Sequence, residues 1–466
     1  MLFFIIFFPV ETKGGPHIFK CDQLFRIIMV MYNPSKISTY PSHPVDRGLR
    51  YHFLGGGNEV GNVGCILEDH SQTRLLFDYG LSPTKPPKYP SAAPNVLDAL
   101  ITHAHIDHIG MVPWLNNSYN TRLHSTEFTS KISKLMWNDC YKISKIERYP
   151  LPWDKKDAEE SEYMWNVHNY DETNEIGEWS WCFRRAGHIP GSAMIDIQTE
   201  DKKILVTGDF DTRNSRLVEG AKPQKTDILF MEGTYGGKNH PVRVDEENRF
   251  LRDIERTVGR GGTVLVPSFA MGRSQEILMI LDNSDLDLEV HYDGMGKTIT
   301  KTMLEHENEL LDPQKLKNIF GRVRKVSSKS DRKKALKADV IVTTSGMLDG
   351  GPAIWYLNRL RQDRRNSVYL TGYQAEGTGG RMLLEKSSLP IYGNITQVDL
   401  ETKRYDFSTH AGHNELVEFV KKTGAEDVIL YHSDNKNAKP KLKHSLQDIG
   451  LNVHDSMNRI SYNIEY

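Results

Sequence analysis

Residues 102–108, THAHIDH, constrain this chain more than any other stretch, because they gather three imidazoles and a carboxylate directly after an apolar segment. In an extended segment His103, His105 and Asp107 point to one side, and a following turn carries Asp107 and His108 towards a second point. Imidazoles and carboxylates are good zinc ligands, so one short loop can serve two metal ions. The alternative is a set of ordinary polar loop histidines, and the density of the motif favours metal binding.

A centre with two metals needs more ligands than one loop provides. AGHIPGSA offers His188 beside glycines, and ILVTGDF offers Asp209 at a strand end, where a carboxylate can bridge two cations. Each residue alone also fits a turn or a helix cap. Asp78 in LLFDYG follows another apolar run, where it is suited to accept a hydrogen bond from a ligating imidazole and fix its tautomer.

The chain repeats a pattern in which an apolar strand runs into a polar, glycine-rich loop. Examples are KKILVTGDF, TDILFMEGTYG, GTVLVPSFAMG and ADVIVTTSGML, and residues 50–79 are typical of short strands joined by tight turns. This pattern indicates an α/β protein whose ligands lie at the carboxyl ends of strands.

Charge leaves the class of partner open. The 466 residues carry a formal net charge of -2, so any phosphate-binding surface must be a local patch. Segment 321–337, GRVRKVSSKSDRKKALK, has eight basic residues against one acid. It fits either a solvated face or an RNA contact.

The cysteines and the N-terminal residues indicate the cellular setting of the protein. Four cysteines lie far apart with no CxxC spacing, which favours a reducing, cytoplasmic setting: Cys21, Cys65, Cys140 and Cys182. The run MLFFIIFFPV has no basic residue before it and is too short to span a bilayer, so no membrane partner is expected. Residues 1–28 are as well explained by a misassigned start as by a native leader.

The ordered motifs LLFDYG, THAHIDH, AGHIPGSA and TGDF resemble those of the metallo-β-lactamase fold, an αββα sandwich that holds two zinc ions at one edge. That fold hosts lactamases, glyoxalases, other hydrolases and nucleases, so it does not fix the substrate. A small-molecule hydrolase of the lactamase type therefore remains an alternative.

The motifs after Asp209 narrow the class of protein within this fold. MEGTYG, PSFAMGRSQE, TTSGMLDGGPA, TGYQAEGTGGR, FSTHAGH and LYHSD resemble the β-CASP group of nucleases, in which an α/β cap domain is inserted into the lactamase-like domain. The resemblance implies an N-terminal extension over 1–48, a discontinuous metallo-β-lactamase domain over 49–215 and 372–466, and a β-CASP domain over 216–371.

The resemblance also assigns roles residue by residue. Four residues would hold the first zinc: His103, His105, His188 and Asp209. The second zinc would take Asp107, His108, the bridging Asp209 and His432. Beside them His410 and Glu232 would form an acid pair, because a neighbouring carboxylate raises the pKa of an imidazole and keeps it ready to protonate a leaving oxygen. Asp107 counts among the catalytic residues, and His413 is expected to be a surface histidine without a role.

The implied reaction is hydrolysis of RNA, leaving a 5′-phosphate and a 3′-hydroxyl. Glycines in TTSGMLDGG permit close approach of backbone N–H groups to a strand's phosphates, at Ser345, Gly346, Gly350 and Gly351. Arg273 is a candidate phosphate contact, with an ion pair as the alternative. Single-stranded RNA is preferred to DNA because the RNA-processing members carry a histidine where this chain has His432.

Within the RNA group, LGGGNEVGNVG and THAHIDHIG look more like archaeal relatives of the endonuclease subunit of the cleavage and polyadenylation specificity factor than like RNase J. The residues before the first motif are too few for the KH domains of many such proteins, so we expect a type without them. The resemblance suggests a homodimer and leaves endonuclease and 5′-to-3′ exonuclease activity both open. A non-catalytic RNA-binding subunit is the remaining alternative, although every expected ligand position is filled.

Overall fold

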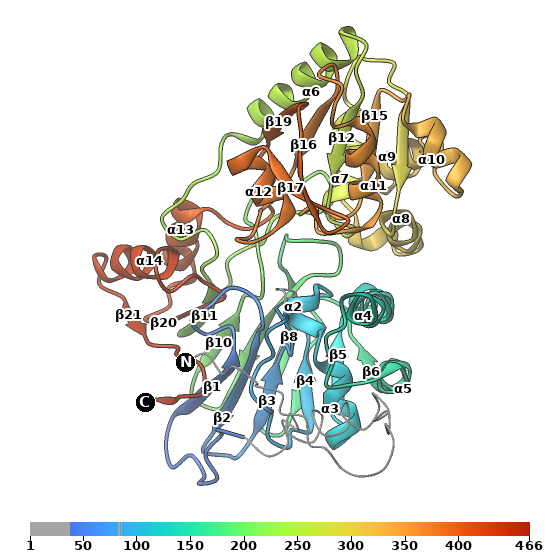
Figure 1. Ribbon diagram of the computed structural model, residues 1–466. Helices are drawn as coiled ribbons and strands as arrows, with labels where there is room; N and C mark the ends of the chain where they lie inside the picture. The colour runs from blue at the N-terminus through green and yellow to red at the C-terminus, as the bar shows by residue number, and fades with distance from the viewer. Residues whose placement is uncertain (1–37, 83, 85) are drawn as a thin grey trace, which may run out of the picture.

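The computed structural model describes residues 38–82, 84 and 86–466. The expectations for residues 1–28 and for Cys21 lie outside this part of the chain. Two lobes are visible, one built on a pair of sheets and one on a single sheet (Figure 1). Within the described ranges no helix combines the length and the apolar character needed to cross a membrane.

The first sheet of the lower lobe has seven strands and begins with an antiparallel meander. β1 pairs with β2 and β2 with β3 in antiparallel fashion, while β3, β4, β5 and β6 run parallel to one another. Its order is β22 (Ser461–Ile464), β1 (Leu49–Gly55), β2 (Gly64–Asp69), β3 (Arg74–Phe77), β4 (Asp98–Leu100), β5 (Arg122–Ser125) and β6 (Trp165–Val167).

The second sheet also has seven strands, and its parallel centre brings together distant parts of the chain. β11 lies between β10 and β20 and runs parallel to both. The sheet order is β21 (Asn452–His454), β20 (Asp427–Tyr431), β11 (Ile228–Glu232), β10 (Lys203–Val206), β9 (Ala193–Gln198), β8 (Trp179–Arg185) and β7 (Asn174–Ile176).

The two sheets pack face to face with helices outside. Alternation in β2 sends Cys65 and Leu67 into the core between the sheets, where Phe230 also lies, and turns Ile66 towards the outer helices. The outer face of the first sheet is covered by α3 (Val112–Tyr119), α4 (Glu127–Glu147) and α5 (Lys155–Glu160). The second sheet is covered by α13 (His413–Thr423) and α14 (Ala438–Gln447). This is the predicted αββα sandwich.

The upper lobe, the cap, is built on a parallel six-stranded sheet flanked by helices. Its strand order is β14 (Arg324–Lys325), β13 (Val290–Asp293), β15 (Val340–Thr343), β12 (Val264–Pro267), β16 (Ser367–Leu370) and β19 (Glu401–Arg404). The helices are α6 (Arg243–Gly259), α7 (Arg273–Leu281), α8 (Gly296–Glu305), α9 (Pro313–Arg322), α10 (Lys329–Ala335), α11 (Gly351–Leu360) and α12 (Gly379–Lys386). A hairpin of β17 (Ser388–Ile391) and β18 (Asn394–Gln397) completes it.

The structure moves both domain boundaries that the motifs suggested. β11 belongs to the second sheet of the sandwich, so the chain enters the cap after residue 232 rather than at 216. β19 pairs with β16 in the cap sheet, so the chain returns to the sandwich after residue 404 rather than at 372. Both boundaries move because strand pairing decides to which lobe a segment belongs, and the order of the motifs does not show how the strands pair.

The carboxyl edge of the cap sheet faces the sandwich. β19 leads through residues 405–409 directly to His410, and Gly272 follows β12. A Cβ added to Gly272 would lie 2.8 Å from Cγ2 of Ile189 in the sandwich. The loops at the strand ends of both lobes therefore meet at one boundary, where parallel sheets commonly present their ligand sites.

Candidate metal centre and active site

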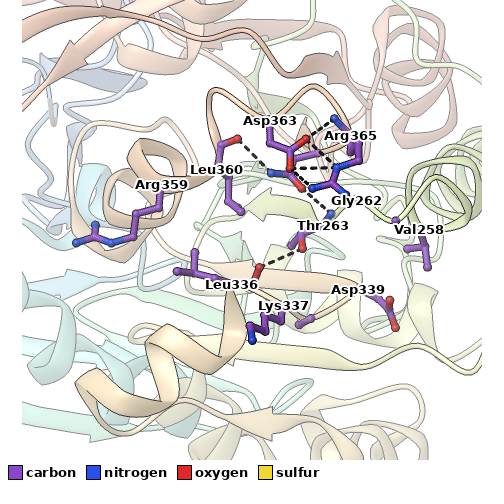
Figure 2. Close-up of a pocket in the computed structure, with 13 residues that line it drawn as sticks. Val258, Gly262, Thr263, Leu336, Lys337, Asp339, Arg359, Leu360, Asp363 and Arg365 are labelled. Carbon is purple, nitrogen blue, oxygen red and sulfur yellow. Dashed lines mark hydrogen bonds and ion pairs between the residues drawn. The ribbon is translucent and has the colours of Figure 1, made fainter.

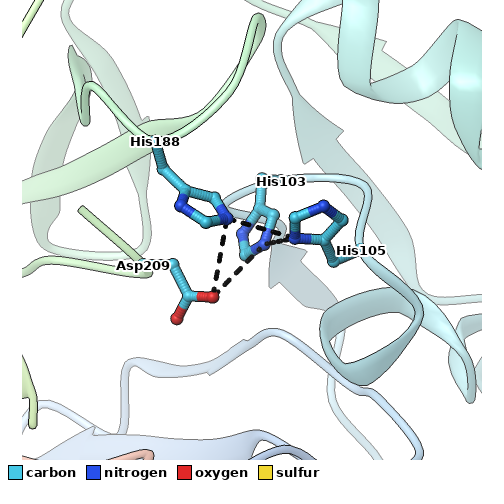
Figure 3. A group of neighbouring side chains, drawn as sticks. All are labelled: His103, His105, His188 and Asp209. Atoms are coloured by element: carbon cyan, nitrogen blue, oxygen red, sulfur yellow. Dashed lines mark hydrogen bonds and ion pairs between the residues drawn. The ribbon is translucent and has the colours of Figure 1, made fainter. Parts of the chain in front are cut away.

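The first predicted ligand group converges as a tripod of imidazoles (Figure 3). His103 and His105 follow β4, and His188 lies between β8 and β9. Nδ1 of His105 is 3.1 Å from Nε2 of His103 and 3.1 Å from Nε2 of His188. Two nitrogens that share a tetrahedral zinc at its usual bond length lie about 3.3 Å apart. The three rings are thus close enough together to hold one ion.

The second predicted group lies on the other side of Asp209, which follows β10. Asp107 and His108 are on α2 (Ile106–Ile109), and His432 directly follows β20. Nε2 of His432 is 3.3 Å from Oδ2 of Asp107. Asp209 Oδ2 is 3.4 Å from His108 Nε2 and 3.6 Å from Nε2 of His103 in the first group. The carboxylate of Asp209 therefore stands between the two groups.

Two atoms of this cluster lack a hydrogen-bond partner and are of kinds that coordinate cations. Nε2 of His108 and Oδ1 of Asp209 are buried and make no hydrogen bond within the described part of the chain. A buried polar atom without a partner is unfavourable, and both atoms are of types that coordinate zinc. The donor set of imidazoles and carboxylates suits a divalent transition metal.

The electrostatics of the two groups differ. Burial lowers the pKa of His103 and His188 well below the ordinary value and that of His105 to about 4, so these rings are neutral, the form that binds a metal. Burial also lowers the pKa of His108 and His432, but the charge of Asp209, together with Asp78 at His108 and Asp107 at His432, outweighs this and raises both. Protons on this second pair thus balance the nearby carboxylates, a balance that cations would otherwise supply.

The predicted acid pair is formed at the edge of the cluster. Nδ1 of His410 is 2.8 Å from Oε1 of Glu232, which also accepts through Oε2 from the backbone N–H of Thr234 at 2.9 Å. His410 Nε2 points the other way and lies 3.9 Å from Asp209 Oδ2. Burial lowers the pKa of His410, but Glu232 and then Asp209 outweigh it and raise the pKa to about 9.

The exposed fractions show which side of the cluster is open. The side chain of His410 is 18% exposed and that of Asp107 23%, whereas Asp209 and His432 are 3% exposed. Water and substrate can therefore reach the centre on the side of His410 and Asp107.

Hydrogen bonds from outside the two groups reach four of the five candidate ligand rings, and the sequence predicted one of these bonds. Asp78 accepts from Nδ1 of His108 at 2.7 Å, as expected, and from the hydroxyl of Thr102. Three further partners were missed: the Thr102 hydroxyl at His103 Nδ1, the Thr234 hydroxyl at His432 Nδ1, and the Thr409 carbonyl at His188 Nδ1. Such partners fix tautomers and ring directions. All three threonines lie within the motifs THAH, EGT and STH.

Comparison with known proteins assigns the family. Family models match residues 57–268 as metallo-beta-lactamase superfamily, 274–383 as Beta-Casp domain, and 396–454 as Zn-dependent metallo-hydrolase RNA specificity domain. The chain is 35% identical to "Probable RNase MJ4" of Methanocaldococcus jannaschii, over 83% of this chain and 93% of that protein. It is 36% identical to "RNase aCSPSF2" of Saccharolobus solfataricus, over 86% of this chain and 82% of that one. This chain belongs to the β-CASP family of the metallo-β-lactamase superfamily.

Two further matches set this β-CASP chain among more distant proteins. It is 30% identical to "Cleavage and polyadenylation specificity factor 73" of Drosophila melanogaster, over 86% of this chain and 62% of that protein. A crystal structure of a protein of unknown function from Enterococcus faecalis matches 90% of the chain with a TM-score of 0.57 at 15% identity, which shows the fold alone. The family membership makes the chain a metal-dependent hydrolase.

The predicted phosphate contacts lie in the β-CASP domain. Ser345 and Gly346 follow β15 at the carboxyl edge, and a Cβ on Gly346 would lie 2.8 Å from the backbone N of Phe269, so the loop packs closely there. Arg273 begins α7 and pairs through Nη1 with Glu276, with its side chain 8% exposed. The ion pair left open as the alternative is therefore present, and Nε of Arg273 makes no hydrogen bond in the described part.

The structure also shows the surroundings of His413 and of the basic segment 321–337. His413 is half-buried, and both of its ring nitrogens have partners, since it accepts from the N–H of Gly237 and contacts the hydroxyl of Ser445. In the basic segment 321–337, three arginines pair with acids: Arg322 with Asp282, Arg324 with Glu289, and Arg332 with Asp293.

A separate cavity of about 500 Å³ lies at the amino ends of β12, β15 and β16, on the edge of the β-CASP sheet opposite the metal centre (Figure 2). Lys337 and Arg359 line it together with Asp363 and Arg365, which form an ion pair with each other. None of the predicted site residues lines this cavity.

Proposed function

We propose that this chain is a zinc-dependent ribonuclease that hydrolyses phosphodiester bonds in single-stranded RNA during RNA 3′-end processing or decay. The observation that carries the proposal is the pair of His410 and Glu232 beside two candidate ligand groups with Asp209 between them. The names of the archaeal relatives and the match to an RNA specificity domain support RNA as the substrate.

The ligands proposed for the first zinc are His103, His105, His188 and Asp209, and those for the second are Asp107, His108, Asp209 and His432. When bound, such ions supply Lewis acidity towards a phosphoryl oxygen and lower the pKa of water. Asp107, whose side chain is 23% exposed, lies on the open side, where it can orient the attacking water.

His410 is the proposed general acid. Glu232 holds its Nδ1, which fixes the ring and favours the protonated form, and leaves Nε2 facing the cluster to protonate the departing 3′ oxygen of the sugar. The products would carry a 5′-phosphate and a 3′-hydroxyl. Protonation of a leaving oxygen by a placed side chain contributes about a hundredfold to ten-thousandfold in rate.

The RNA strand is proposed to run along the boundary between the lobes. The loops at the carboxyl edge of the β-CASP sheet, with Ser345 and Gly346, would bring backbone N–H groups towards its phosphates. Arg273 is a weaker candidate for such a contact, because its guanidinium already pairs with Glu276. Homodimerisation and a cytoplasmic location remain expectations, and light scattering of the purified protein tests the first.

The assay for this proposal is direct. Purified protein is incubated with end-labelled single-stranded RNA, the matching DNA and a chromogenic lactam, with and without a chelator. We expect RNA to be shortened only without the chelator, and not at all by His103→Ala protein. Preferential hydrolysis of the lactam would support a small-molecule hydrolase instead, and RNA binding without cleavage would support a non-catalytic subunit.

The ends of the products decide between the two modes of cleavage. RNA carrying a 5′-triphosphate and RNA carrying a 5′-monophosphate are digested in parallel, and the product ends are mapped. Internal cuts in both substrates indicate an endonuclease, whereas stepwise loss that requires the monophosphate indicates a 5′-to-3′ exonuclease.

A further inference from the structure

One carboxylate of the β-CASP domain is buried against the metallo-β-lactamase domain. Glu309 ends the short 3₁₀ turn η3 (Glu307–Glu309) between α8 and α9, and its side chain is 5% exposed. Its Oε2 accepts from the hydroxyl of Tyr170 at 3.0 Å and from the N–H of Gly191 at 3.2 Å, and lies 3.5 Å from Nη1 of Arg185. These three partners all belong to the sandwich, so Glu309 joins the two lobes.

Little solvent reaches the carboxylate of Glu309, although the side chain of Arg185 is 41% exposed. The cavity that Glu309 lines has a volume of only about 10 Å³, room for no more than one water. Arg185 reinforces the junction, because its Nη2 donates to the carbonyl of Asn308 at 3.0 Å and its guanidinium lies 4.3 Å from the ring centre of Tyr170. Burial raises the pKa of Glu309, and Arg185, Tyr170 and Gly191 offset only part of this cost of burying the carboxylate.

Gly191 belongs to the loop that carries the proposed ligand His188. Its carbonyl accepts from the hydroxyls of Thr126 at 2.7 Å and Thr129 at 3.0 Å, both on the sandwich side. Its φ of +79° is in the left-handed region that favours glycine. The sandwich therefore fixes the carbonyl of Gly191, and the β-CASP domain fixes its N–H through Glu309.

The same loop is in contact with the β-CASP domain and with the chain leaving it at two more points. Ile189 rests against Gly272, the residue before α7. Nδ1 of His188 donates to the carbonyl of Thr409, which lies on the linker that leaves the β-CASP domain. The proposed ligand His188 is thus held in place by groups whose positions depend on how the two lobes sit together.

We propose that Glu309 is a positioning residue of the β-CASP domain that fixes the His188 loop for metal binding, so that metal affinity and closure of the two lobes are coupled. The inference rests on the proposed metal centre. Because coupling between two equilibria is reciprocal, a metal bound at His188 must also strengthen the junction at Glu309. Removing a group that orients a metal ligand typically lowers metal affinity by about tenfold to a hundredfold.

The test uses Co²⁺ as the probe, because its visible absorption reports tetrahedral coordination. Protein stripped of metal is titrated with Co²⁺ in competition with a chelator. We expect Glu309→Ala to bind Co²⁺ about tenfold to a hundredfold more weakly than the unmodified chain. Glu309→Gln keeps a carbonyl oxygen that can accept from Gly191 and should restore most of the affinity, which a loss of folding would not allow.

Glu307→Ala is the matched control, since Glu307 is exposed on the same 3₁₀ turn, and it should bind Co²⁺ like the unmodified chain. In hydrogen exchange, Co²⁺ should protect residues 306–311 in the unmodified chain and not in Glu309→Ala. If Glu309→Ala binds Co²⁺ as tightly as the unmodified chain, the positioning role alone is overturned. An unmodified chain that binds no Co²⁺ overturns the proposed metal centre as well.

Discussion

Nδ1 of His410 lies 2.8 Å from Oε1 of Glu232, although 178 positions of the chain separate the two residues. Glu232 ends β11 in the sandwich, and His410 follows β19 of the β-CASP sheet. The intervening chain forms the β-CASP domain. The acid pair therefore exists only when that domain is folded and its exit strand is paired.

Replacement of His410 by alanine is predicted to lower the rate of RNA cleavage by about a hundredfold to ten-thousandfold, because the leaving oxygen loses its proton donor. Glu232→Gln should also lower the rate, since an amide neither charges nor orients the imidazole in the same way. Single-turnover cleavage of labelled RNA measures both effects.

His444 provides the control for this pair, because its side chain is 79% exposed on α14 and its ion-pair partner is Asp448 rather than a proposed ligand. His444→Ala should cleave RNA at the rate of the unmodified chain. Full activity of His410→Ala would remove His410 from the proposed mechanism while leaving the metal centre intact.

Asp209→Asn is predicted to disrupt both ligand groups at once. Oδ2 of Asp209 faces His103 and His108, which belong to different groups, and an amide is a poorer bridge than a carboxylate. Elemental analysis should find two zinc ions per unmodified chain and less than half of that in the variant. Asp201→Asn, at an exposed position, should keep the full complement, and equal metal in all three proteins would contradict the bridging role.

Asp78→Asn tests the outer hydrogen bonds. Asp78 accepts from His108 Nδ1 and is fully buried, so an amide would lose the charge that keeps the ring oriented. We expect metal affinity, measured by competition with a chelator, to fall about tenfold to a hundredfold. A variant with unchanged affinity and the same melting temperature would show that Asp78 does not orient His108.

The convergence of the candidate ligands could be predicted from the sequence because the chemistry of each residue and its place at a strand end are both local properties. His103, His188 and Asp209 each follow a strand in a glycine-rich or polar loop, and β8 and β10, which precede His188 and Asp209, both run antiparallel to β9 and so end at the same edge of their sheet. The resemblance then supplied the distant members, His410 and Glu232, whose pairing no local pattern shows.

The remaining features depend on contacts between distant segments. The domain limits were misplaced because β19 pairs with β16, and pairing is not encoded in motif order. The sequence does not single out Glu309, because it is one of three glutamates in the segment EHENE. Only the fold shows that its carboxylate accepts a hydrogen bond from the N–H of Gly191. For Arg273 the sequence left two partners open, an RNA phosphate and an acidic side chain. The fold shows that Arg273 forms an ion pair with Glu276.

Asp98, which begins β4, is predicted to make folding stability depend on acid pH. Burial raises its pKa, but hydrogen bonds from His124 at 2.9 Å and Arg122 at 2.7 Å outweigh this and lower the pKa below the ordinary value. Ionised Asp98 therefore stabilises the fold fully above about pH 4, the ordinary range for an unfolded aspartate, and this contribution is lost as the pH falls through the lower folded pKa. At pH 7 Asp98→Asn should lower the free energy of unfolding by about 1–3 kcal/mol.

The difference in the free energy of unfolding between Asp98→Asn and the unmodified chain should shrink as the pH falls from about 5 to about 3, because the unmodified carboxyl then binds its proton as well. Urea denaturation at several pH values measures this difference. Asp285→Asn, at an exposed position, should show a small difference at every pH. If the Asp98→Asn difference were the same at pH 7 and pH 3, the ionised carboxylate would not be the source of the stability. The paired strand β4 would then owe its stability to burial of Ala99 and Leu100 alone.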